Sequence, residues 1–262
     1  MKLFYRHFGS GDPVIILHGL FGLSDNWVTH GKRLAEKFSV YLPDLRNHGH
    51  SPHSPTFNYP AMADDLHEFI DEHKLQNPVI IGHSMGGKVA MWLALEYPDL
   101  VSKLVIVDIS PVKYPDRDAH FDIISTMMSI DFDAVHSREE VSELLSLTIP
   151  NKATRLFILK NLHRKTRSNF DWRLNLSAIS SNMDHVFAGI DIDSVYDKPV
   201  LFIKGGRSDY ILESHEPVIN KYFPNAEIET IDHAGHWVHA DAPDEICSIF
   251  SRFLDKECTF QP

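Results

Sequence analysis

One stretch of the sequence, residues 79–87, constrains the fold more than any other. A short apolar run at 79–81 leads into Gly82-His83-Ser84-Met85-Gly86-Gly87, and small and apolar residues then recur at helical spacing as far as Tyr97. A short apolar run bounded by turn residues is typical of a buried strand. The stretch therefore predicts a strand that turns tightly into a helix, with Ser84 at the corner.

The residues around Ser84 fit the chemistry of a nucleophile. Gly82 and Gly86 flank Ser84 at the G-x-S-x-G spacing, where a side chain would collide with the turn, and a tight turn lifts the serine hydroxyl clear of the sheet. The helix that begins at Met85 directs its free N–H groups and the positive end of its dipole toward an oxyanion beside Ser84. The alternative is a glycine-rich turn that only packs a helix against a sheet.

Composition favours one catalytic domain with an insertion. The chain has 262 residues, of which 43% are hydrophobic, so it can bury a large core. Asp and Glu number 36 against 25 Lys and Arg, and the net charge of −11 argues against a general nucleic-acid or anionic-membrane surface.

The cysteines and the N-terminus favour a soluble protein of a reducing compartment. Cys247 and Cys258 are the only cysteines, which leaves no disulfide framework and no thiolate metal cluster. The N-terminal residues become polar too early for a signal peptide, and no apolar run is long enough for a membrane span. We expect a cytoplasmic monomer or homodimer that acts on a small molecule and binds neither nucleic acid nor membrane.

The order of elements predicts an α/β fold with a mostly parallel central sheet and helices on both faces. Such a sheet carries its active groups at the carboxyl ends of its strands. We expect strands at 2–8, 14–17, 38–42, 79–81, 101–107, 200–203 and 227–231, and helices at 26–37, 60–74, 85–97 and 244–254.

Between residues 111 and 197 the pattern changes to short amphipathic helices with no convincing buried strand. We interpret this segment as a helical cap, or lid, inserted into a core made of residues 1–110 and 198–262. Phe170, Trp172, Leu174 and Leu176 either line an acyl pocket or form the core of this layer, and the sequence leaves both readings open.

The loop after the strand at 14–17 predicts half of an oxyanion hole. Its sequence is His18-Gly19-Leu20-Phe21-Gly22, and the two glycines allow a backbone N–H to face inward. Acyl transfer needs two donors aimed at the developing oxyanion. We expect the Met85 N–H to be one and Leu20 to supply the other, in preference to Phe21. The alternative is a plain strand–helix turn.

A histidine-rich loop raises the question of a metal site. His48, His50 and His53 could converge, but no paired carboxylate and no H-E-x-x-H spacing accompanies them. We therefore expect no metal, and an ordered loop tied by Asp44 and Arg46.

Histidine and acid candidates for a triad follow Ser84 in the chain. His236 is preferred over His233 and His239 as general base because Gly235 gives it the freedom to reach the serine. Asp209, after the penultimate strand, and Asp108, after the strand at 101–107, can both reach this histidine, and Asp209 is favoured modestly.

These motifs, together with Val107-Asp108-Ile109-Ser110-Pro111 and Ala234-Gly235-His236-Trp237, resemble those of the α/β-hydrolase superfamily, and most of all those of the bacterial YbfF-like esterases. The resemblance implies a carboxylesterase for short acyl esters, with acyl thioesters as a further class. It also implies that a serine matching Ser208 takes the usual place of the acid and that Asp108 contributes. Asp209 beside Ser208 departs from that pattern, so both acids stay open.

Other functions use the same residues. Serine at position 84 argues against dehalogenase or epoxide hydrolase chemistry, which needs a carboxylate nucleophile. A carbon–carbon bond hydrolase, a perhydrolase, a lyase and a non-catalytic ligand-binding module remain as alternatives, and none of the triad mechanisms requires a cofactor.

Overall fold

A computed structural model describes residues 1–115, 118–166 and 169–255. Cys258 lies outside these residues, so only Cys247, a buried free thiol, can be placed. No helix within the described residues is both long and apolar enough to cross a membrane.

A seven-stranded sheet with the order β1-β3-β2-β4-β5-β8-β9 forms the centre of the fold. Only β1 runs antiparallel to its neighbour; the other pairings are parallel. Because these strands are parallel, the carboxyl ends of β2, β4, β5, β8 and β9 lie at the same end of the sheet, as the sequence predicts. The strands are β1 (Tyr5–Phe8), β2 (Pro13–Leu17), β3 (Ser39–Pro43), β4 (Val79–His83), β5 (Lys103–Val107), β8 (Val200–Gly205) and β9 (Ala226–Ile231).

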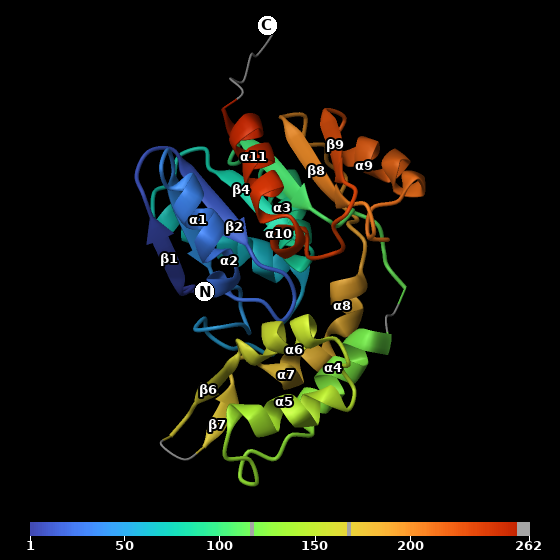
Figure 1. Cartoon of the computed structure of the whole chain (residues 1–262). Helices are drawn as coiled ribbons and strands as arrows, with labels where there is room; N and C mark the ends of the chain where they lie inside the picture. Colours follow the sequence, from blue (N-terminus) through green and yellow to red (C-terminus); the bar gives the residue numbers. More distant parts are fainter. Residues whose placement is uncertain (116–117, 167–168, 256–262) are drawn as a thin grey trace, which may run out of the picture.

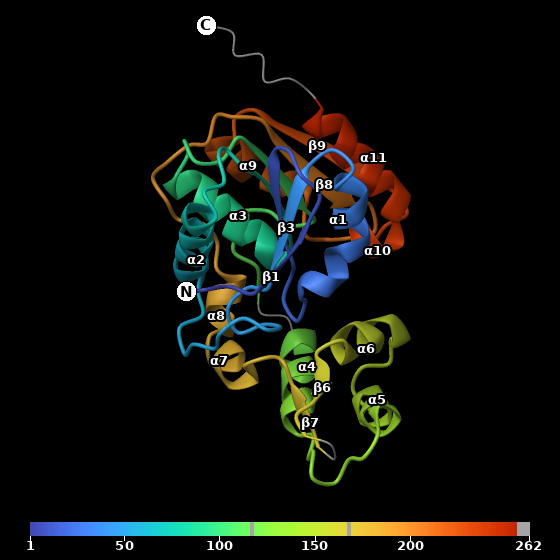
Figure 2. The ribbon, with the colours of Figure 1, turned by 90° about the vertical axis from the view of Figure 1, so that its left-hand side faces the viewer.

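Helices cover both faces of this sheet because its central strands are apolar on both sides. Along β2, for example, Ile15 and Leu17 pack with the α2 and α3 side, whereas Val14 and Ile16 pack with the α1 and α11 side. Figures 1 and 2 show the two helix layers. One layer holds α2 (Tyr59–Glu72), α3 (Met85–Glu96) and α9 (Glu216–Tyr222); the other holds α1 (Val28–Leu34), α10 (Val238–Asp241) and α11 (Pro243–Leu254), and the short 3₁₀ turns are η1 (Ser24–Trp27) and η2 (Glu213–His215).

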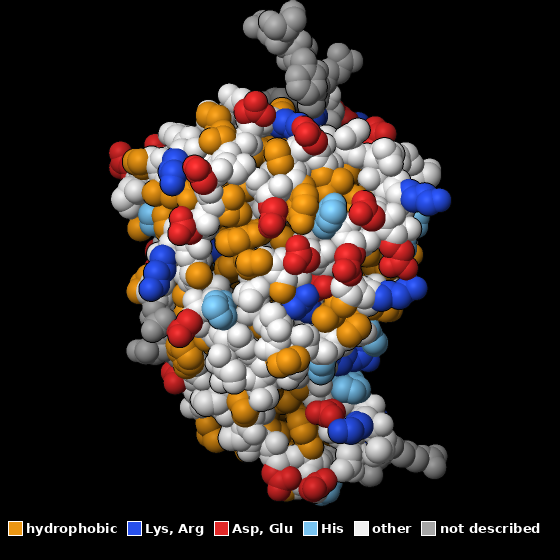
Figure 3. All heavy atoms as spheres, turned by 180° about the vertical axis from the view of Figure 1, so that it is seen from behind, with side chains coloured by type: hydrophobic (Ala, Val, Ile, Leu, Met, Phe, Trp, Pro, Cys, Tyr) orange, Lys and Arg blue, Asp and Glu red, His pale blue; other side chains and the backbone are white. Residues whose placement is uncertain are grey.

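The outer surface over α2 and α3 is mixed in character. Figure 3 shows acidic side chains spread among basic and apolar ones across this face. This distribution agrees with the acidic balance of the whole chain, whose net charge is −11.

The segment between β5 and β8 lies beyond one end of the sheet, as the green and yellow elements of Figures 1 and 2 show. It is mainly helical, as expected, but it also contains an antiparallel hairpin that the sequence analysis did not predict. Each hairpin strand has only three residues, too few for an alternating pattern to be recognised. The elements are α4 (Asp118–Met128), α5 (Arg138–Ser146), α6 (Lys152–Leu159), β6 (Leu162–Arg164), β7 (Phe170–Trp172), α7 (Leu176–Ser181) and α8 (Met183–Phe187).

A buried lysine on α3 joins both ends of this inserted segment. The Lys88 ammonium donates a hydrogen bond to the Val112 carbonyl at 2.8 Å and another to the Ala188 carbonyl. The rings of Tyr114 and Tyr59 lie 4.9 and 5.6 Å from it and also favour a cation. Desolvation nevertheless lowers the pKa of Lys88 to about 7.

Lys88 should make stability rise with pH above neutrality. Its pKa is about 7 in the folded chain, below the unfolded value of about 10.4. The unfolded chain therefore binds more protons between these values, and the stability of wild type relative to Lys88→Met should increase by about 2 kcal/mol from about pH 7 to about pH 9. Urea unfolding at both pH values measures this difference. Lys152→Met, which alters an exposed lysine on α6, is the control, and an unchanged difference for Lys88→Met would contradict the expectation.

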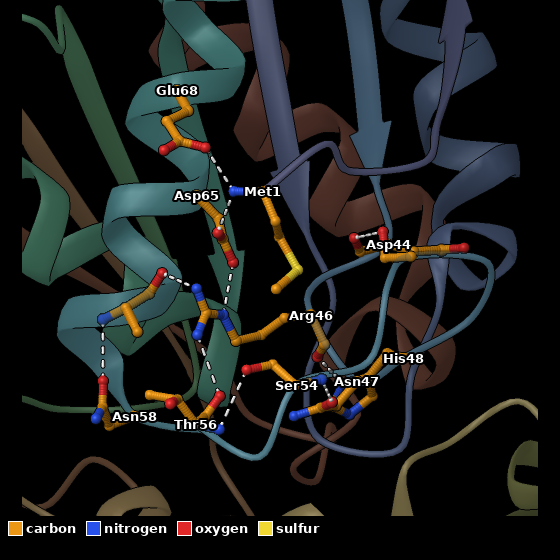
Figure 4. Close-up of polar contacts among 12 residues, drawn as sticks. Met1, Asp44, Arg46, Asn47, His48, Ser54, Thr56, Asn58, Asp65 and Glu68 are labelled. Carbon is orange, nitrogen blue, oxygen red and sulfur yellow. Dashed lines mark hydrogen bonds and ion pairs between the residues drawn. The ribbon is translucent and has the colours of Figure 1, made fainter.

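The loop after β3 is tied down as the sequence predicts. The Asp44 carboxylate accepts hydrogen bonds from the N–H groups of Ser24 at 2.6 Å and His50 at 2.8 Å. Figure 4 shows the Arg46 guanidinium between the loop and α2, where its Nε donates to Asp65 at 2.6 Å. These contacts fix the loop that follows the carboxyl end of β3.

Candidate active site

Ser84 occupies the corner between β4 and α3. Its φ and ψ are 51° and −120°, a strained conformation that the neighbouring glycines make room for. A Cβ at Gly82 would lie 2.4 Å from the Gly86 carbonyl oxygen, and a Cβ at Gly86 would lie 2.5 Å from the His18 carbonyl oxygen. The Ser84 N–H donates to Val107 of β5 at 3.0 Å, which anchors the corner to the sheet. The predicted strand–turn–helix around Ser84 is therefore present.

His236 and Asp108 complete a line of hydrogen bonds with this serine. The Asp108 carboxylate accepts from His236 Nδ1 at 2.8 Å, so the proton of the neutral imidazole lies on Nδ1. His236 Nε2 is then free to accept from the Ser84 hydroxyl, at 3.0 Å. The three residues follow β4, β5 and β9, whose carboxyl ends meet at one edge of the sheet.

Asp108 is held as a buried carboxylate. It is 0% exposed and has a φ of 51°. One carboxylate oxygen accepts from the Gly205 N–H at 2.8 Å, and the other accepts from the Ser208 hydroxyl as well as from His236. The resemblance to YbfF-like esterases implied roles for Ser208 and Asp108, and the structure brings these two side chains into contact.

The structure does not place Asp209 where the sequence analysis preferred it. Asp209 is exposed, and both ring nitrogens of His236 are already bonded, to Asp108 and to Ser84. Parallel strands end side by side, so the acid after β5 reaches the histidine directly, whereas the turn after β8 presents Ser208 instead. Sequence order alone cannot distinguish two acids that both follow strand ends.

The two other histidines near His236 occupy different positions. His233 is exposed, 3.8 Å from Glu245, and His239 is buried with its ring stacked on Trp27 at 4.4 Å. The preference for His236 among the three therefore agrees with the geometry.

Two residues that the sequence analysis overlooked hold the His236 ring. Tyr210 stacks on one face with ring centroids 3.9 Å apart and planes inclined by 20°. His83 donates from Nε2 to the His236 carbonyl at 2.9 Å, and burial keeps the pKa of His83 well below its usual value, so it stays neutral. His83 lies inside the G-x-S-x-G motif, but nothing in the sequence indicates the stacking of Tyr210.

Hydrogen bonds fix the orientation of two peptide units in the loop after β2. The Gly19 carbonyl accepts from the Gly22 N–H and from His18 Nδ1, both at 2.9 Å. The Gly19 carbonyl and the Leu20 N–H belong to the same peptide unit, and in a planar trans peptide these two groups point in opposite directions. The Leu20 N–H therefore points away from the partners of the Gly19 carbonyl. The Phe21 N–H is directed to His48 Nε2 at 3.3 Å. The geometry therefore favours Leu20 over Phe21 as a donor beside Met85, the first residue of α3.

Two neutral histidines fix this loop. His18 donates from Nδ1 to the Gly19 carbonyl and accepts at Nε2 from the Leu45 N–H, at 3.0 Å. His48 donates from Nδ1 to the Arg46 carbonyl and accepts at Nε2 from the Phe21 N–H. Burial lowers the pKa of His18 to about 4 and that of His48 to about 3. Protonation would replace each accepting nitrogen with a donor, so the loop depends on the neutral forms.

The histidine-rich loop does not converge on a metal position. His48 lies under the Phe21 N–H, His50 packs on the Phe4 ring and contacts Arg173, and His53 is exposed. Within the described residues no group of three or more His, Cys, Asp or Glu side chains could hold a metal ion.

A cavity of about 70 Å³ faces the serine. Side chains of α4 and α6 in the inserted segment contribute to its lining, and among the described residues His120 and Thr154 are the polar ones that these helices supply. The lining residues are Gly19, Leu20, Phe21, His83, Ser84, His120, Ile123, Thr154, Phe157, Ile158, His236 and Trp237.

The four residues proposed to line either a pocket or a core lie in the interior of the inserted segment. Phe170, Trp172, Leu174 and Leu176 are all buried. Trp172 Nε1 donates to the Met127 carbonyl at 3.0 Å, which fixes its ring inside this layer. These residues stabilise the segment, while the cavity is lined by other side chains.

The arrangement can perform nucleophilic catalysis at a carbonyl. A serine hydroxyl bonded to a neutral imidazole can lose its proton as it attacks, and a buried carboxylate on the far nitrogen stabilises the imidazolium that results. Backbone N–H groups at the start of a helix stabilise the negative charge that develops on the carbonyl oxygen.

Comparison with known proteins agrees with this geometry. Residues 12–145 match the family described as alpha/beta hydrolase fold. A solved marine microorganism esterase is 44% identical, with a TM-score of 0.94, and the match covers 96% of this chain and 99% of that one.

Curated relatives extend over the same length. Esterase YbfF of Escherichia coli is 33% identical, covering 94% of both chains, which confirms the resemblance inferred from the motifs. An sn-1-specific diacylglycerol lipase of Mus musculus is 38% identical, covering 92% of this chain and 80% of that protein. The chain therefore belongs to the alpha/beta hydrolase fold family, within which it is an esterase- and lipase-like hydrolase.

Proposed function

We propose that this protein is a serine carboxylesterase that hydrolyses short-chain acyl esters through an acyl-enzyme on Ser84. The observation that carries the proposal is the continuous line from Ser84 through His236 to Asp108, with distances of 3.0 and 2.8 Å, at the wall of a cavity. In this proposal residues 111–197 act as a cap over a core of residues 1–110 and 198–262.

The proposed reaction has two halves. Ser84 Oγ attacks the ester carbonyl while His236 Nε2 takes its proton, and the N–H groups of Met85 and Leu20 stabilise the oxyanion. His236 then protonates the leaving alcohol, and the acyl group remains on Ser84. Water repeats the sequence in reverse, with His236 as base, and releases the acid. Throughout, Asp108 accepts the hydrogen bond from His236 Nδ1 and so keeps the imidazole in place.

The cavity supports a preference for short acyl groups. Its volume of about 70 Å³ is well below the roughly 300 Å³ of the smaller pockets that enclose drug-sized ligands. Aromatic side chains of Phe21, Phe157 and Trp237 form much of its wall. A long acyl chain would require α4 and α6 to move away, whereas acetyl to butyryl groups would not. Acyl thioesters present the same carbonyl and are a second substrate class for the same site.

Hydrolysis of p-nitrophenyl esters from acetyl to dodecanoyl tests the proposal. We expect kcat/KM to be highest for the short esters and to fall steeply beyond butyryl. Rapid acid quenching followed by peptide mass spectrometry should find the acyl group on Ser84. Ser84→Ala, which keeps the fold and removes the nucleophile, should give neither turnover nor adduct.

Three outcomes would overturn parts of this proposal. A maximum at long acyl chains would contradict the short-chain preference. Turnover with no adduct on Ser84 would favour lyase chemistry. Ligand binding without turnover, unchanged in Ser84→Ala, would indicate a binding module.

A further inference from the structure

The turn that presents Leu20 contains a strained residue. Phe21 is buried and adopts a φ of 60°, in the left-handed region that a side chain with a Cβ disfavours. A residue keeps this conformation only where its surroundings hold it there. The peptide units on either side of Phe21 therefore need firm partners.

The Gly22 N–H of the second unit donates to the Gly19 carbonyl within the loop, and each unit also has one partner outside the loop. The Phe21 N–H donates to His48 Nε2 at 3.3 Å, from the loop after β3. The Phe21 carbonyl accepts from Asn161 Nδ2 at 2.7 Å, from the inserted segment. The oxyanion loop is thus held by the core on one side and by the inserted segment on the other.

Asn161 is itself rigidly placed. It is 0% exposed and lies between α6 and β6. Its backbone N–H donates to the Ile158 carbonyl at 2.9 Å, and its carbonyl accepts from the Arg173 N–H at 2.9 Å. Its Nδ2 also lies 3.3 Å from the Ile158 carbonyl, so this end of the amide faces two acceptors and must be the nitrogen.

We propose that Asn161 is a positioning residue for the oxyanion hole: by holding the Phe21 carbonyl it keeps the Leu20 N–H aimed at the reacting carbonyl. The inserted segment thereby acts on catalysis as well as on substrate size, because the donor is correctly aimed only when this segment is docked. The inference rests on the proposed esterase function.

Asn161→Ala tests it, with Asn175→Ala as the matched control. Asn175 also belongs to the inserted segment and donates to Asn47 Oδ1 at 3.1 Å, but it does not touch the oxyanion loop. Three quantities should be measured for each variant: kcat and KM for a short p-nitrophenyl ester, the inhibition constant of a trifluoromethyl ketone, and the thermal midpoint. The ketone forms a tetrahedral adduct with the serine, and its oxyanion probes the hole directly.

For Asn161→Ala we expect kcat to fall by about 10- to 100-fold with little change in KM, because loosening a donor costs no more than deleting one. The inhibition constant should rise by the same factor. For Asn175→Ala we expect a lowered thermal midpoint with kcat and inhibition close to wild type. Asn161→Leu, which conserves volume and lacks a donor, carries the same expectation if the alanine variant does not fold.

The inference fails if Asn161→Ala and Asn161→Leu keep wild-type kcat, or if both positions lose activity in parallel with stability. An unchanged inhibition constant alongside a lowered kcat would also overturn it. Failure of the esterase proposal is distinguishable, because wild type itself would then give no turnover and no adduct.

Discussion

Replacing Asp108 with asparagine should lower kcat by about 10⁴-fold, whereas Asp209→Asn should leave it within about twofold. An asparagine at position 108 has nearly the same shape but can present an N–H to His236. The imidazole would then place its proton on Nε2, and Nε2 could no longer accept the proton of Ser84. Asp209 is exposed, and the two ring nitrogens of His236 are bonded to Asp108 and Ser84, so we expect the neutral asparagine at position 209 to change kcat little.

Steady-state hydrolysis of p-nitrophenyl acetate by the two variants measures this difference. Ser84→Ala defines the background rate, and the thermal midpoint of each variant shows whether the fold is intact. Equal losses in the two variants, or a larger loss in Asp209→Asn, would return the role of the acid to Asp209. A rise in KM alone, with kcat unchanged, would show that Asp108 does not orient His236 for proton transfer.

Acidification from about pH 7 to about pH 5.5 should reduce the free energy of unfolding by about 5 kcal/mol. Five buried histidines have a pKa below the unfolded value of about 6.5. Burial lowers the pKa of His18 and His30 to about 4 and the pKa of His48 and His239 to about 3. It also lowers the pKa of the fifth, His83, well below the usual value.

The direction of this effect follows from proton binding. Below about pH 6.5 the unfolded chain protonates these histidines while the folded chain keeps them neutral, so stability falls as pH falls. Each contributes about 1 kcal/mol over this range, and the total is a large fraction of the 5–15 kcal/mol that is typical of whole proteins. The loss would continue until the folded pKa values of about 4 and about 3 are reached.

Urea unfolding followed by circular dichroism between about pH 7 and about pH 5.5 checks this expectation. His239→Gln removes one buried histidine and should flatten the pH dependence, while His53→Gln, at an exposed position, should leave it as in wild type. A denaturation midpoint that does not change with pH would show that these groups are protonated or solvated in the folded chain.

Local patterns predicted the candidate nucleophile and the candidate base because the requirements of such residues are local. Ser84 needs glycines two residues before and after it, since the Gly82 and Gly86 positions touch backbone. His236 needs only a flexible loop after a strand. The sheet strands were also predictable, because apolar runs buried on both faces are continuous in the sequence.

The inserted segment between β5 and β8 was predicted less completely. Its amphipathic helices repeat over enough residues to be recognised, but the strands Leu162–Arg164 and Phe170–Trp172 are stabilised by pairing with each other. A strand of three residues is too short to show the alternation of apolar and polar residues by which strands are recognised in a sequence. The role of Asn161 was equally invisible, since its partner Phe21 is 140 positions away.

By itself, the sequence determined the α/β fold, the corner that carries Ser84 and the candidate groups of the triad. Only the tertiary structure brought Asp108 to the ring of His236, directed the Phe21 N–H to His48, and stacked Tyr210 on the imidazole. The reason is physical. Backbone conformation and burial depend on neighbours along the chain, whereas hydrogen bonds among side chains at strand ends depend on which strands lie side by side.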